Sequence, residues 1–284
     1  MNTANHTAPS HGATSPLPAN KYLADDRPGN TALKNGEADH RSFLLLSAPR
    51  SGSNLLRDCL NQHESIRCFG EIFKNRSFNR KQWQRLSGAA AELTPELKHL
   101  HETDLVSFWK MILAKYRLDK PVIGAKMFYH HSEGEEIWHY LASSRTPIIH
   151  LVREELIDSY LSLTLAEASW IWRQEKDAKM DVEYNHNVSI DLHRFEQYCR
   201  KLRRYFDSTE VLFRDNPYLK ITYAALVNDR EQTMPEVYSF LGLPNRETWP
   251  RLTKQLARSR EEVVTNWSEV ASFIKTNEDL CVVH

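Results

Sequence analysis

The residues best suited to chemistry lie in a short turn near the start of the chain, within "FLLLSAPRSGSNLL" (43–56). An apolar run is followed by the turn Pro-Arg-Ser-Gly-Ser (49–53), and then by an amphipathic helical pattern. A turn between a buried strand and a helix directs backbone N–H groups, and the positive end of the helix dipole, toward one point. The stretch therefore predicts a site for an anion.

The side chains of the turn indicate which anion. Gly52 lets a ligand approach the backbone, and Arg50 adds a planar cation whose N–H groups match sulfate or phosphate oxygens. Short polar donors complete the loop: Ser51, Ser53 and Asn54. A nucleoside-triphosphate loop would end in Gly-Lys-Ser/Thr and hold magnesium, and that ending is missing here. The loop predicts a phosphate or sulfate ligand other than magnesium-ATP.

Further candidates follow two other predicted strands. Arg153 comes directly after the strand expected at 146–152, and His130 and His131 end the strand expected at 121–129. Ligands of open α/β sheets collect at the carboxyl ends of the strands, so these side chains are expected near the loop. Lys126 stands inside an apolar strand, where an unpaired charge is costly. It either contacts a reacting group or is exposed at a sheet edge.

These side chains must be held by regular elements, and the hydrophobic pattern predicts them. Strands are expected at 42–48, 121–129, 146–152 and 218–223. Helices are expected at 54–63, 104–117, 134–143, 155–173, 191–213, 230–241 and 258–275. This alternation predicts an α/β fold, a single P-loop-type domain at 41–284 with a central parallel sheet flanked by helices on both faces. Residues 1–40 lack apolar periodicity and are expected to form a disordered tail.

Composition excludes several classes of protein. The 284 residues hold 37 Lys plus Arg and 37 Asp plus Glu, so no global charge favours nucleic acid. Cys59, His63 and Cys68 match no metal-ligand spacing and are interpreted as ordinary residues. No apolar run approaches the roughly 18 residues of a membrane span, and no secretory signal opens the chain. A soluble, cytoplasmic protein is expected.

Four segments together resemble a known family. "APRSGSNLL" is similar to the 5′-phosphosulfate loop of sulfotransferases, in particular their bacterial carbohydrate and glycolipid branch. "IIHLVREELIDSYLSLTLA" (148–166) is similar to the second family signature, which binds the 3′-phosphate of the nucleotide. The resemblance implies 3′-phosphoadenosine 5′-phosphosulfate (PAPS) as the sulfuryl donor, without a metal. It places the 3′-phosphate on Arg153 and Ser162, with Ser159 as a weaker candidate.

The other two segments complete the nucleotide site by resemblance. "LKITYAALVNDREQTMPEVYSFLGLP" (219–244) is similar to the family segment whose tyrosine, here Tyr223, lies against the adenine in some members. This chain has Ala224-Ala225 where the family favours Glu-Asp. "TKQLARSREEVVTNWSEVASF" (253–273) resembles the C-terminal basic region that closes over the nucleotide. Its candidate nucleotide ligands are Lys254, Gln255 and Arg258.

The resemblance also implies the reaction, the transfer of a sulfuryl group to an acceptor hydroxyl or amine. "GEIF" (70–73) resembles the stretch that carries the proposed base of bacterial sulfotransferases, so Glu71 is the first candidate. A surface carboxylate after a turn is the alternative interpretation. His130 and His131 are the next candidates, either as base or as acceptor contacts. Arg50 and the loop N–H groups would stabilise charge on the leaving phosphate.

The acceptor is predicted only as a class. A carbohydrate or glycolipid hydroxyl leads by resemblance, and a small lipid or secondary metabolite is the alternative. A catalytically inactive nucleotide-binding homologue and a P-loop kinase are the other hypotheses. Four tryptophans could stack on sugars or belong to the core: Trp83, Trp109, Trp170 and Trp172. Apolar faces on the helices expected at 155–173 and 191–213 could support a homodimer.

Overall fold

The computed structural model describes residues 41–74, 78–87, 92–131, 135–169, 187–249 and 258–283. The tail expected at 1–40 lies outside the described residues. Four of the candidates named above also lie outside them: Trp170, Trp172, Lys254 and Gln255.

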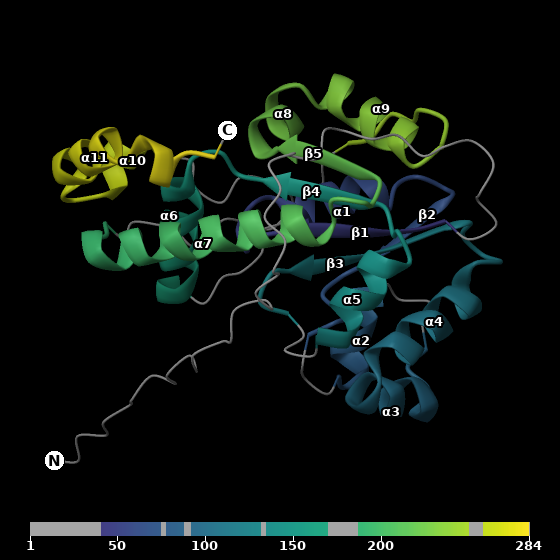
Figure 1. The fold of residues 1–284 in the computed structure, drawn as a ribbon. Coiled ribbons are helices and arrows are strands. Elements are labelled where there is room, and N and C mark those ends of the chain that lie inside the picture. The colour runs from purple at the N-terminus through teal and green to yellow at the C-terminus, as the bar shows by residue number, and fades with distance from the viewer. Residues whose placement is uncertain are drawn as a thin grey trace, which may run out of the picture.

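A five-stranded sheet forms the centre of the fold (Figure 1). In the order β2-β3-β1-β4-β5, every neighbouring pair of strands is parallel. The strands are β1 (Arg41–Ser47), β2 (Ile66–Phe69), β3 (Val122–Phe128), β4 (Ile148–Val152) and β5 (Tyr218–Thr222). The predicted α/β class with a parallel sheet is confirmed, and so are the four predicted strands. Strand β2 was not predicted, because its four residues are too few for a pattern and include the charged Arg67.

Helices cover both faces of the sheet. The first eight are α1 (Ser53–Leu60), α2 (Arg80–Ser87), α3 (Pro95–Thr103), α4 (Leu105–Tyr116), α5 (Glu135–Ser143), α6 (Leu156–Ser169), α7 (Leu192–Leu212) and α8 (Tyr223–Asn228). They are followed by α9 (Arg230–Phe240), α10 (Arg260–Val263), α11 (Trp267–Thr276) and α12 (Glu278–Cys281). Within the described ranges, none of these helices combines the length and apolar character that crossing a membrane requires.

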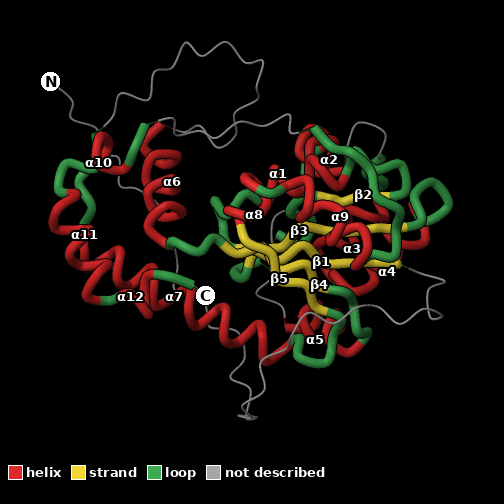
Figure 2. Tube along the Cα trace, turned by 90° about the horizontal axis from the view of Figure 1, so that it is seen from above, coloured by secondary structure: helices red, strands yellow, loops and turns green. Residues whose placement is uncertain are grey.

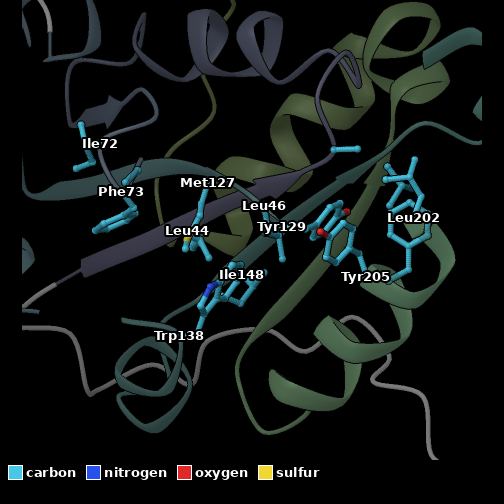
Figure 3. Packing of buried hydrophobic residues seen from close by; sticks show 14 of the residues in the cluster. Leu44, Leu46, Ile72, Phe73, Met127, Tyr129, Trp138, Ile148, Leu202 and Tyr205 are labelled. Carbon is cyan, nitrogen blue, oxygen red and sulfur yellow. The ribbon is translucent and has the colours of Figure 1, made fainter. Parts of the chain in front are cut away.

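Alternation along β1 divides the core between the two faces. Leu44 and Leu46 join a cluster with Met127, Ile148 and Trp138 (Figure 3), whereas Phe43 and Leu45 join a separate cluster that includes residues of α1, α8 and α9. Successive side chains of a strand point to opposite faces, so an unbroken apolar run is what a strand covered on both sides requires. The apolar run of β1 therefore specifies a central strand.

One glycine of the sheet allows a close approach between neighbouring strands. Gly124 of β3 is the register partner of Phe43 of β1, and a Cβ added at Gly124 would lie 2.1 Å from the ring of Phe43. No side chain fits at that distance, so the Phe43 ring can occupy this position only because residue 124 is glycine.

The topology brings the ends of all five strands to one edge. Because the strands are parallel, the segments that follow them lie at the same side of the sheet. Strands β2 and β3 lie next to β1 in one direction across the sheet, and β4 and β5 lie next to it in the other. The loop after β1 therefore lies at a switch point in strand order. Helices α6, α10 and α11 stand beyond this edge (Figures 1 and 2). A ligand site is expected between the strand ends and these helices.

The helices differ from the prediction in two ways. The helix expected at 258–275 is interrupted between α10 and α11, where Val264 is extended and pairs with Val188. Asn266 bonds the backbone of Ile190 at this break through its amide. Helices α2, α3, α8 and α12 were not predicted at all. The first two lie in a polar stretch that carries only a few buried anchors, such as Trp83 and Leu97.

Candidate active site

The loop after β1 has the backbone of an anion cradle. Arg50 and Gly52 both have positive φ angles, 65° and 86°, and α1 begins at Ser53. A positive φ is uncommon outside glycine, and turns of this kind bring successive N–H groups to face one point. Ser51 and Ser53 are buried within the turn. The loop that is predicted to bind an anion thus has a backbone conformation suited to that role.

Tyr223 packs on the glycine of this loop. A Cβ added at Gly52 would lie 2.5 Å from the Tyr223 ring, so the ring lies directly on the glycine. The guanidinium of Arg153 also lies against the ring, 4.5 Å from its centroid. The predicted nucleotide residues at the ends of β1, β4 and β5 are therefore in mutual contact.

Two arginines and a serine join the loop to α6. Arg50 donates from Nε to Ser162 Oγ at 3.0 Å, and Arg153 donates from Nη1 to the carbonyl oxygen of Arg50 at 3.1 Å. These contacts bridge 112 and 103 positions of the chain, so only the fold can make them. Ser162 and Arg153 thus each contact Arg50, and their shared role at the 3′-phosphate stays a prediction.

Ser159 differs from Ser162 although both are on α6. The Ser159 side chain is fully buried, donates to the carbonyl of Leu156 and accepts from the hydroxyl of Tyr198 at 2.9 Å. Its hydroxyl therefore serves the packing of α6 on α7. The weaker of the two serine candidates is a structural residue.

Two charged residues beside Arg153, Asp158 and Arg260, were not predicted from the sequence. Asp158, in the first turn of α6, lies 3.3 Å from Arg153 Nη2 and accepts from Nε of Arg260 at 2.7 Å. Burial and the charge of Arg153 lower the pKa of Arg260. The sequence signal was an acidic residue in a first turn and one arginine among several, which is common on any surface. Arg258, which was predicted, instead bonds Asn187 and the carbonyl of Glu262.

On the other side of the loop, a buried lysine joins it to Glu71. Lys126 is 2% exposed and donates from Nζ to Asn54 Oδ1 at 2.7 Å, and the same atom lies 3.0 Å from Glu71 Oε1. Exposure at a sheet edge was the wrong alternative for Lys126, because β3 lies between β2 and β1. The lysine is neutralised by the first candidate base and is linked to the first turn of α1.

Glu71 is held as an anion by its neighbours. Burial alone would raise its pKa, but the charges of Lys126 and Lys74 outweigh burial and hold the pKa below its usual range. Lys74 lies 2.9 Å from Glu71 Oε2. Burial in turn lowers the pKa of Lys126, against the opposing charge of Glu71. The carboxylate is therefore ionised at neutral pH.

The two histidines after β3 have different surroundings. His131 is 2% exposed, its Nδ1 accepts the backbone N–H of Phe128, and its Nε2 lies 3.7 Å from Glu71 Oε2. Burial lowers the pKa of His131 to about 3. His130 is exposed and stacks on Phe128, with ring centroids 5.8 Å apart. Of the two, His130 is the one that solvent reaches.

Two of the tryptophans that could either stack on sugars or belong to the core lie in the core. Trp83 and Trp109 are at most 1% exposed and pack on Phe69 and Phe73 respectively. In the part of the chain that the structure describes, no group of His, Cys, Asp and Glu is arranged to hold a metal ion.

Fold and site together define an α/β protein with an anion loop at the centre of a parallel sheet. Residues 43–247 match the family described as "Sulfotransferase family". The chain belongs to the sulfotransferase family.

Several solved structures are similar in fold. A sulfotransferase from Alicyclobacillus acidocaldarius has 12% identity and a TM-score of 0.45, with 86% of this chain and 95% of that chain covered. The sulfotransferase domain of the Synechococcus PCC 7002 olefin synthase has 17% identity and a TM-score of 0.45, with 89% and 99% covered. A mouse sulfotransferase complexed with PAP has 12% identity and a TM-score of 0.44, with 86% and 84% covered. No curated protein matches the sequence of this chain.

Proposed function

We propose that the protein transfers the sulfuryl group of PAPS to an acceptor hydroxyl, with a carbohydrate or glycolipid as the favoured acceptor. The observation that carries the proposal is the position of the loop after β1. On one side it contacts Arg153 and Ser162, and on the other it reaches Glu71 through Asn54 and Lys126. Arginine side chains for a nucleotide and a carboxylate for a proton thus flank one anion cradle.

The arginine side has the chemistry that a nucleotide with two phosphate-type groups needs. The loop N–H groups and Arg50 would hold the 5′-phosphosulfate, and Arg153 with Ser162 would hold the 3′-phosphate. Tyr223, between Gly52 and Arg153, would carry the adenine on its ring. Bound PAPS would supply a sulfuryl group that moves as SO3 to the acceptor oxygen.

The protein's own groups would stabilise the charges of this transfer. As the acceptor oxygen bonds to sulfur, the bond from sulfur to the phosphate oxygen breaks and its electron pair stays on that oxygen. Arg50 and the loop N–H groups would meet the charge that develops there. By analogy with phosphoryl transfer, positioning and charge stabilisation are the main contributions of the protein.

Glu71 would receive the proton of the acceptor. The carboxylate is ionised at neutral pH, as a proton acceptor must be, and a positioned base commonly contributes about 10²- to 10⁴-fold to the rate. His131 is less suited to the role, because the lone pair of its Nδ1 already accepts the Phe128 N–H. His130 is exposed at the end of β3 and would contact the acceptor.

Thermal shift tests the donor. Unfolding midpoints are measured with 3′-phosphoadenosine 5′-phosphate, adenosine 5′-phosphate and magnesium-ATP. At about 100 times its dissociation constant, a ligand adds about 2.7 kcal/mol of stability. Arg153→Ala should lose most of the response to the bisphosphate. Arg214→Ala is the matched control, because Arg214 precedes β5 at the opposite end of the sheet and pairs only weakly with Asp215, 3.8 Å away.

Selective stabilisation by the bisphosphate supports PAPS as the donor. Equal stabilisation by magnesium-ATP, or the same response from both variants, would reject it. Transfer of radiolabelled sulfate from PAPS to panels of glycans, glycolipids and small lipids then tests the acceptor. Binding without product on any panel would instead indicate a nucleotide-binding homologue without activity.

A further inference from the structure

His131 has a buried N–H group without a hydrogen-bond acceptor. Phe128 donates its backbone N–H to Nδ1 at 3.1 Å, so the lone pair of a neutral ring lies on Nδ1 and its proton on Nε2. The backbone N–H of His131 donates to the carbonyl oxygen of Phe128 at 2.9 Å, so the backbone of His131 is held in the same turn as Phe128. The Nε2 atom is buried and makes no hydrogen bond. A buried donor of this kind needs an explanation.

The acceptor that this donor faces is the carboxylate of Glu71. Nε2 lies 3.7 Å from Oε2, beyond the upper limit of about 3.2 Å for an N–H···O hydrogen bond. The charged groups near the ring are Glu71, Lys74 and Lys126, together with the adjacent His130. Among these only Glu71 is an anion. A small rotation of either side chain would close the hydrogen bond.

The lone pairs of Glu71 show what this bond would do. A carboxylate has about four acceptor positions, two on each oxygen. Oε2 already accepts Lys74 at 2.9 Å, so a bond from His131 would fill it. Oε1 faces Lys126 at 3.0 Å and retains one position. That remaining position belongs to the oxygen joined through Lys126 to Asn54 and the anion loop.

We propose that His131 is a positioning residue that donates its Nε2–H to Glu71 Oε2 and thereby directs proton acceptance to Oε1. This inference rests on Glu71 being the base of the proposed reaction. His131 itself never takes the proton: its ring stays neutral, and the transferred proton moves from the acceptor oxygen to Glu71 Oε1. The fixed tautomer keeps the base in one orientation toward the loop.

Kinetics of two variants test the role. His131→Gln retains an amide N–H, and His131→Phe retains none. We expect His131→Gln to keep kcat within about 3-fold of the wild type, and His131→Phe to lower kcat about 10-fold or more, with the KM for PAPS unchanged in both. His139→Phe is the control, because His139 is an exposed residue of α5. The acidic limb of the pH–rate profile should stay where it is in His131→Gln.

Three outcomes would overturn the inference. If both variants lose activity together with the acidic limb, His131 is the base itself. If both keep full activity, or both lose stability and kcat in parallel, its role is purely structural.

A spectroscopic test does not depend on turnover. Nitrogen-15 NMR of the histidine rings should show His131 as the neutral Nε2–H tautomer from pH 5 to pH 8. Its Nε2 resonance should shift in Glu71→Gln. Titration of His131 near pH 6.5, or a proton on Nδ1, contradicts the inference whether or not sulfuryl transfer is detected. Absence of transfer with the expected tautomer would reject only the proposed function.

Discussion

The ion pair between Glu71 and Lys126 makes a quantitative prediction about stability. Lys126 Nζ lies 3.0 Å from Glu71 Oε1, and the lysine is 2% exposed. With an effective dielectric constant of about 20, two unit charges at this distance attract by about 5 kcal/mol. Removing one partner of a buried pair commonly costs about 3–5 kcal/mol, because the other charge stays buried. The pair should therefore show strong coupling in a double-mutant cycle.

The two single variants should lose different amounts of stability, because the remaining partner has different contacts in each. Glu71→Gln leaves the ammonium of Lys126 buried beside neutral acceptors, the amide oxygens of Asn54 and of the new glutamine, without an anion to balance its charge, and we expect a loss of about 3 kcal/mol. Lys126→Met leaves a carboxylate that is 20% exposed and still pairs with Lys74, so we expect about 2 kcal/mol. The double variant should lose about 2 kcal/mol, well below the sum of the two, which gives a coupling energy of about 3 kcal/mol.

Urea unfolding followed by tryptophan fluorescence measures all four proteins. The deficit of Glu71→Gln should shrink as pH rises, because a buried Lys126 without its anion sheds its proton more easily than the unfolded chain does. The exposed pair Arg246–Glu64, at 3.1 Å, is the control cycle and should couple by about 0–1 kcal/mol. Additive losses at Glu71 and Lys126, within about 0.5 kcal/mol, would refute the claim that the two charges depend on one another.

Three further predictions address other parts of the site and core. His131 and His150 have a pKa of about 3 in the folded protein and about 6.5 in the unfolded chain. The unfolded chain therefore binds more protons, and the free energy of unfolding decreases as the pH is lowered below about 6.5. Each of the two histidines should lower the free energy of unfolding by about 1.2 kcal/mol between pH 6 and pH 5. Urea unfolding of His150→Gln at both pH values should show half of the loss that the two histidines together cause in the wild type. Ser162→Ala should weaken the binding of 3′-phosphoadenosine 5′-phosphate about 10-fold in calorimetry, with little change in the free energy of unfolding. Ser159→Ala should lower the free energy of unfolding by about 1–2 kcal/mol and leave the binding unchanged. Equal effects of the two variants on binding would contradict the distinction between the serines. Gly52→Ala should lower the free energy of unfolding by about 1–2 kcal/mol, because φ at this position is 86° and the new Cβ overlaps the Tyr223 ring. The same change should abolish most of the shift in unfolding midpoint that the bisphosphate causes. An unchanged shift would refute the geometry of the loop.

The strands found from the sequence are those whose burial on both faces forces a continuous apolar run. Residues 43–46 are Phe-Leu-Leu-Leu, and such a run is typical of a strand that is covered on both faces of a parallel sheet. Strand β2 escaped because it lies at a sheet edge and has only four residues, one of them Arg67, which pairs with Asp119. The break between α10 and α11 was not predicted, because it coincides with the pairing of Val264 with Val188, which is 76 positions away in the chain.

The sequence by itself determined the local chemistry of this protein. A strand, a glycine turn and a helix start are neighbours in the chain, so the anion loop with Arg50 and Gly52 follows from residue order alone. The same holds for Arg153 at the end of β4, and for membership of the sulfotransferase family through residues 43–247.

Only the tertiary structure decided which of these groups meet. The contacts of Arg50 with Ser162 and of Lys126 with Asn54 join residues 112 and 72 positions apart, and the choice between Ser159 and Ser162 depends on which face of α6 packs against α7. The protonation of Glu71 and the tautomer of His131 depend on burial and on charges brought together by the sheet. Those energies are set by distances in space, which residue order does not contain.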